Sequence, residues 1–89
     1  MKTINYRNRQ FTKGNGVWLR GQKVGTITEI SENKEEQEVN LTILTFRCKT
    51  ILMTLWKNKV FINNGYRGKI EHLLGDTAQE LFSAWEKKN

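Results

Sequence analysis

The chain has 89 residues, which suffices for one modest hydrophobic core and a single domain spanning residues 1–89. Hydrophobic residues make up 37% and aromatic residues 10%, which excludes an intrinsically disordered chain, and no apolar run approaches the roughly 18–20 residues that span a bilayer. The formal net charge of +6 favours an anionic partner over a membrane interior or a basic protein surface.

The N-terminal segment Met1–Phe11 carries three basic residues with no apolar run behind them, so it does not resemble a secretory signal. Cys48 is the only cysteine, which excludes an internal disulfide framework and a multi-cysteine zinc site. A reduced setting is the default for such a chain. We therefore expect a cytoplasmic protein with no membrane partner.

A β-hairpin is predicted around Gly21-Gln22, because a two-residue connection with glycine first fits a type II′ turn. In the resulting register Trp18 faces Gly25, which leaves room for the indole ring. One face of this hairpin reads as core: Val17, Leu19, Val24 and Thr26. The opposite face is aromatic and basic: Trp18, Arg20, Lys23, Gly25 and Ile27.

Three further segments are expected to contribute to the same sheet. Ser31–Glu38 has no apolar residue and is a loop or an extended hairpin tip. Val39–Phe46 is predicted to be a central strand, in which the shift of the apolar set to Leu44 and Phe46 indicates a bulge or burial on both faces. Ile51–Trp56 is a second apolar run that its period alone does not assign.

A second hairpin is expected where the strands Val60–Ile62 and Tyr66–Ile70 flank Asn63-Asn64-Gly65, since Asn-Gly suits turns that need positive φ. The chain contains no proline, so its strand edges lack that protection and a homodimer through an edge is an open alternative.

The C-terminus is predicted to be helical over Thr77–Lys87. Thr77 with Glu80 fits a capping box, and Asp76 is a rival N-cap. The apolar stripe at helical spacing consists of Ala78, Leu81, Phe82 and Trp85. Ile70, Leu73 and Leu74 show the same spacing before Gly75, which would close a short preceding helix. We therefore expect an α+β fold: a small, mostly antiparallel β-sheet or partly open barrel with a C-terminal α-helix packed on it.

The charges are arranged in blocks. Residues 1–28 hold six basic side chains and no acid, residues 29–38 hold five glutamates and one lysine, and residues 39–69 again hold six basic side chains and no acid. If the two cationic segments share a sheet, the local field exceeds what the net charge implies.

Candidate catalytic groups are few, and we expect no enzyme. His72 is the only histidine, and its neighbour Glu71 points elsewhere if the segment is helical. Cys48 is expected to be a small core residue, although Arg47 and Lys49 beside it would lower a thiol pKa if all three met. No glycine-rich phosphate loop, EF-hand spacing or metal-ligand cluster is present in the sequence, so no cofactor or metal is expected.

Nucleic-acid binding is the leading functional hypothesis, because it needs a cationic surface for phosphates and aromatic faces for bases. Aromatic and basic residues alternate at several places, while Phe46, Phe61, Phe82 and Trp85 are assigned to the core. No RNP, KH, helix-turn-helix or zinc-finger signature accompanies them. The candidate binding residues are Arg7, Arg9, Trp18, Arg20, Lys23, Lys57, Lys59 and Arg67.

The alternative is an accessory protein, of the kind phages and mobile elements encode, that binds and inhibits or modulates a larger host protein. Small size, the lack of catalytic groups and the charge blocks motivate it. The acidic cluster at 29–38 would then mimic phosphates toward a basic partner. Salt separates the two hypotheses, because nucleic-acid binding weakens steeply with salt and a dry protein interface changes less.

Overall fold

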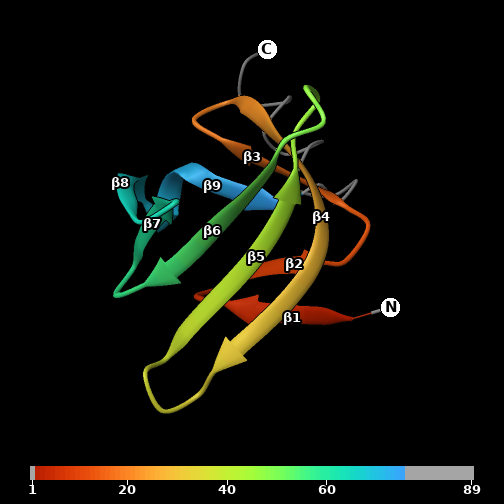
Figure 1. Ribbon diagram of the computed structural model, residues 1–89. Coiled ribbons are helices and arrows are strands. Elements are labelled where there is room, and N and C mark those ends of the chain that lie inside the picture. The colour runs from red at the N-terminus through yellow and green to blue at the C-terminus, as the bar shows by residue number, and fades with distance from the viewer. Residues whose placement is uncertain (1, 76–89) are drawn as a thin grey trace.

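The computed structural model describes residues 2–75 as a curled antiparallel sheet with a separate β-hairpin against it (Figure 1). Seven strands in the order β8-β7-β6-β5-β4-β3-β9 form the sheet, which curls into a half-barrel. The elements are β1 (Thr3–Tyr6), β2 (Arg9–Thr12), β3 (Gly16–Leu19), β4 (Gln22–Asn33), β5 (Glu38–Leu44), β6 (Thr50–Trp56), β7 (Lys59–Ile62), β8 (Gly65–Lys69), the 3₁₀ helix η1 (Ile70–His72) and β9 (Leu73–Gly75). No helix in this part of the chain is long and apolar enough to cross a membrane.

The predicted α+β class is wrong. Residues 2–75 are nearly all β, with no α-helix among them and only the three-residue η1. The spacing of Ile70, Leu73 and Leu74 predicts a short helix, but Leu73–Gly75 is an extended strand that pairs with β3. Leu73 lies opposite Leu19, and Gly75 lies opposite Val17. The helix predicted at Thr77–Lys87, with its anchors Leu81, Phe82 and Trp85, lies outside the described residues.

The core lies between the concave side of the sheet and the β1–β2 hairpin. Alternation places Val39, Leu41 and Ile43 of β5 on this side, fully or almost fully buried. Phe11 of β2 is the largest fully buried side chain, and it contributes the aromatic ring that fills the core. The aromatic residues assigned to the core from sequence lie elsewhere: Phe46 is 83% exposed and Phe61 is only half-buried.

Four hairpins close through two-residue turns whose residues both have positive φ, as type I′ turns require. These turns are Arg7-Asn8, Arg20-Gly21, Lys57-Asn58 and Asn63-Asn64. Such turns match the right-handed twist of the strands that they join. The predicted hairpin at Asn63-Asn64-Gly65 is present, but its two turn residues are Asn63 and Asn64, and Gly65 begins β8 opposite Ile62. Three of the four turns begin with a cationic residue.

The predicted register of the β3–β4 hairpin is wrong, because the turn lies one residue earlier in the chain than predicted. The turn is Arg20-Gly21, so Trp18 pairs with Lys23 and Val17 pairs with Gly25, with a bulge between these pairs. The side chains of β4 therefore lie on the opposite faces from those predicted. Ile27, predicted on the outer surface, is only 1% exposed and belongs to the core.

Gly25 is needed for a different contact from the one predicted. A Cβ there would lie 2.7 Å from Cγ2 of Ile43 and closer still to the carbonyl oxygen of Leu44. Gly25 thus allows β5 to approach β4, and it does not make room for an indole ring.

The turn between β5 and β6 corrects two further predictions. Cys48 is exposed and has a φ of 59°, so it is a turn residue and not a small core residue. The N–H of Cys48 donates to the carbonyl of Thr45 at 2.9 Å, and the N–H of Thr45 donates to the carbonyl of Lys49 at 2.8 Å. The apolar shift at Leu44 and Phe46 therefore marks the end of β5, and the bulge lies in β4 between Ile27 and Glu29.

Candidate nucleic-acid interface

The convex side of β6, β7 and β8 carries a row of aromatic and cationic side chains. Trp56 pairs with Lys59, which in turn pairs with Lys69, and Phe61 pairs with Tyr66 in the next row. Directly opposed residues share a face, and their neighbours Leu55, Val60 and Gly68 are buried on the other side. We name this surface the cationic-aromatic face: Trp56, Lys59, Phe61, Tyr66 and Lys69.

A bulge produces this arrangement. Between Val60 and Phe61 the pairing of β7 with β8 shifts, so Arg67 is the extra residue on β8. Without the shift, Tyr66 and Lys69 would lie on opposite sides of the sheet, because residues three apart on a strand alternate. The bulge therefore brings an aromatic and a cationic side chain of one short strand to the same face, with Arg67 exposed at its rim.

The aromatic rings of this face offer surface for stacking. Tyr66 is 55% exposed and meets Phe61 edge-on, with ring centroids 5.9 Å apart and planes at 67°. Lys57 Nζ lies 4.4 Å from the centroid of the Trp56 ring, a cation–π distance. Because these contacts already restrict the rings, little further side-chain entropy is lost when a flat ligand stacks on them.

No carboxylate of residues 2–75 neutralises the charge of this face. Lys59 and Lys69 lie directly opposite each other, and neither has a carboxylate within salt-bridge distance among residues 2–75. The strands concerned belong to the acid-free segment 39–69. Two like charges at a cross-strand position are unfavourable for the fold alone and favourable for holding an anion.

Of the eight candidate residues, the structure brings Lys57, Lys59 and Arg67 together at this face. Arg7 lies at the tip of the β1–β2 hairpin, near Lys57. Trp18 and Lys23 pair with each other on the convex side of β3 and β4. One strand, β5, separates Lys23 from β6, and two strands, β4 and β5, separate Trp18 from β6. Nε1 of Trp18 is buried and has no hydrogen-bond partner among the described residues.

The remaining two candidates, Arg9 and Arg20, contact the protein itself. The guanidinium of Arg9 donates to the carbonyl oxygens of Ile70 and Glu71, both at 3.0 Å. That of Arg20 covers Gly68, where a Cβ would lie 3.2 Å from its Nη2. Both side chains thereby pack against the β8–η1–β9 segment that links the two edges of the sheet.

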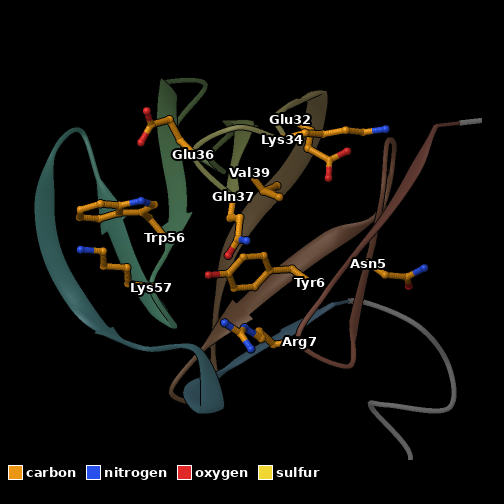
Figure 2. Close-up of a pocket in the computed structure, with 10 residues that line it drawn as sticks. All are labelled: Asn5, Tyr6, Arg7, Glu32, Lys34, Glu36, Gln37, Val39, Trp56 and Lys57. Carbon is orange, nitrogen blue, oxygen red and sulfur yellow. The ribbon is translucent and has the colours of Figure 1, made fainter.

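A hollow of about 420 Å³ adjoins the cationic-aromatic face, between the tips of three hairpins (Figure 2). The β1–β2, β4–β5 and β6–β7 tips supply its walls. Trp56 and Lys57 belong to its lining as well as to the edge of the face. Its other polar and aromatic lining residues are Asn5, Tyr6, Arg7, Glu32, Lys34, Glu36 and Gln37.

One hydrogen bond ties two of these tips together. The backbone N–H of Asn58, in the β6–β7 turn, donates to the hydroxyl of Tyr6, at the end of β1, over 3.1 Å. Tyr6 is partly buried against the core, so its ring is held at both ends. This hydrogen bond fixes the spacing of the β1–β2 and β6–β7 tips, and with it two of the three walls of the hollow.

Comparison with known proteins found no match: no family model, no curated protein and no solved structure resembles the chain.

Sequence reasoning missed Phe61, Tyr66 and Lys69 as members of one surface. Phe61 was placed in the core, and Lys69 carried no local signal. The Asn63-Asn64 turn would have given the pair Phe61–Tyr66, but only the bulge at Arg67 adds Lys69 to that face.

The described residues contain no group of three or more side chains able to hold a metal ion. His72 and Cys48 are both exposed, and they lie on η1 and in the β5–β6 turn respectively. That neither carries chemistry remains a prediction.

Proposed function

We propose that this protein is a small, non-enzymatic nucleic-acid-binding protein that uses the cationic-aromatic face. The pairing of Lys59 with Lys69, with no ion-pair partner for either among residues 2–75 and with the exposed Tyr66 ring beside them, is the observation that carries the proposal. Ammonium groups neutralise phosphates and release counterions, while bases stack on aromatic rings with little regard to sequence. Lys57 and Arg67 extend the positive charge to the two ends of the face.

Titration of labelled oligonucleotides, single- and double-stranded, at two salt concentrations tests the proposal. Lys59→Ala should lower the log–log salt slope by roughly 0.7–0.9, the value of one phosphate contact. Tyr66→Ala should cost about 1–3 kcal/mol of binding free energy through lost stacking. Lys49→Ala is the matched control, because Lys49 is an exposed cation at the opposite end of β6. Absence of binding by the wild type at low salt would refute the proposal.

A second candidate function, modulation of a larger host protein, is favoured by a different surface. Leu44, Phe46 and Leu52 are 41%, 83% and 41% exposed at the β5–β6 end of the sheet. Exposed apolar side chains that gather in one place are typical of protein interfaces. Phe46→Ser should then abolish capture of the host protein after nuclease treatment while leaving oligonucleotide binding unchanged. If the partner is instead a second copy of this chain, the same substitution should convert a dimer to a monomer in sedimentation.

A further inference from the structure

We infer that the hollow between the three hairpin tips receives one unpaired nucleobase, so that the nucleic-acid partner is single-stranded. This inference rests on the proposed function and specifies its ligand. The hollow begins where the cationic-aromatic face ends, because Trp56 and Lys57 belong to both. When the phosphates of a nucleic-acid strand bind Lys59 and Lys69, the nucleotides that follow them along the strand therefore lie at the hollow.

The size and rigidity of the hollow suit a flat ligand. Its volume of about 420 Å³ falls within the range of about 300–1,000 Å³ that small-molecule sites occupy. The Tyr6 hydroxyl is held by Asn58, and the β4–β5 tip is closed by the N–H of Glu36 donating to Oδ1 of Asn33 at 3.2 Å. Because these hydrogen bonds already hold the hairpin tips in place, binding loses less conformational entropy there.

The chemistry of the walls separates a base from a phosphate. Tyr6 and Trp56 present aromatic rings, and Figure 2 shows Tyr6 in the centre of the lining and Trp56 to one side of it with Lys57 next to Trp56. Glu36 and Gln37 offer oxygens that accept hydrogen bonds from base amino and imino groups. The carboxylates of Glu32 and Glu36 repel phosphates, whereas Arg7 and Lys57 attract them, so the base enters and its phosphates stay at the cationic rim.

The Watson–Crick edge must be free for such contacts, and in a duplex that edge is paired. Entry from a duplex would require the base to be flipped out at a cost of a few kcal/mol. Guanine presents two adjacent donors on this edge, N1–H and N2–H₂, and so matches carboxylate acceptors better than thymine with its single N3–H. Single strands with guanine should therefore bind most tightly.

Fluorescence anisotropy with labelled oligothymidylates tests the inference. Three versions of one strand carry a central guanine, a central thymine or a central abasic site, and a duplex serves as competitor. We expect the guanine strand to bind roughly 5- to 100-fold more tightly than the abasic strand, the equivalent of one stacked base, and the duplex to compete poorly. Equal affinity for all three strands, or for the duplex, would overturn the inference.

Substitutions keep the two proposals separable. Tyr6→Ala should remove the preference for guanine over the abasic site, and far-ultraviolet circular dichroism shows whether that variant folds. Glu36→Gln, an exposed change with no packing consequence, should lower the affinity for the guanine strand several-fold and leave the affinity for the thymine strand unchanged. Glu35→Gln is the matched control on the same tip, outside the hollow. Binding that depends on Lys59 but not on Tyr6 or Glu36 would refute this inference and leave the proposed function intact; no binding at all would refute both.

Discussion

Lys59 and Lys69 face each other across β7 and β8, and neither forms an ion pair with a carboxylate of residues 2–75. Directly opposed like charges destabilise a sheet by an amount comparable to other cross-strand pairs, about 0.2–1 kcal/mol. Lys69→Glu should therefore raise the free energy of unfolding by up to about 1 kcal/mol in urea denaturation while weakening oligonucleotide binding. A variant that loses stability and keeps its affinity would show that the pair serves the fold and not a ligand.

Arg9 should behave as a structural residue although the sequence predicts it to be a binding residue. Its guanidinium donates to two carbonyls that lie 61 and 62 positions further along the chain. We expect Arg9→Met to lower the free energy of unfolding by about 1.5–3 kcal/mol, as for hydrogen bonds to a charged group. Arg9→Lys should rescue only part of this, because an ammonium lacks the planar fork. Arg67→Met, at an exposed position, is the control and should leave stability unchanged.

Gly25 and Gly21 make a contrasting pair. Gly25→Ala forces a methyl group against Ile43 and Leu44, so the free energy of unfolding should fall by about 3 kcal/mol or more. At Gly21 nothing lies within 4 Å of a new Cβ, and only its φ of 81° opposes alanine, at a cost of about 1–2 kcal/mol. Thermal unfolding of the two variants should give the larger loss for Gly25→Ala; the reverse order would contradict the close approach of β5.

Cys48→Gly should leave stability unchanged or raise it by up to about 1 kcal/mol, because glycine adopts a φ of 59° without steric cost. The exposed thiol should also react with a thiol reagent in the folded protein as fast as in urea. Slow labelling of the folded protein, together with a large loss of stability in the glycine variant, would contradict this exposed position and show that Cys48 is buried in the core.

Strands β5, β6 and β7 could be predicted because each coincides with a run of apolar residues, and β8 could be predicted from the asparagine-glycine turn before it. The β1–β2 hairpin could not, since its four-residue strands have a single buried apolar residue each and its turn, Arg7-Asn8, has no glycine. The register of β3 with β4 was missed because Arg20 adopts the positive φ that glycine usually supplies. The roles of Arg9 and Lys69 come from contacts between distant or bulged segments, which no local pattern encodes.

The pairing of β3 with β9 joins the start of the sheet to the end of the described chain. Every other ladder connects strands that are neighbours in sequence, so these hairpins can close over short loops soon after they are synthesised. Val17, in contrast, can pair with Gly75, the last residue described, only after nearly all of the sheet has been synthesised. On a ribosome the meander from β3 to β8 can therefore assemble while the edge of β3 is still open, and β9 covers that edge only when it emerges. The contacts of Arg9 with Ile70 and of Arg20 with Gly68 can likewise form only after this last segment has been made, so they belong to the same final closure.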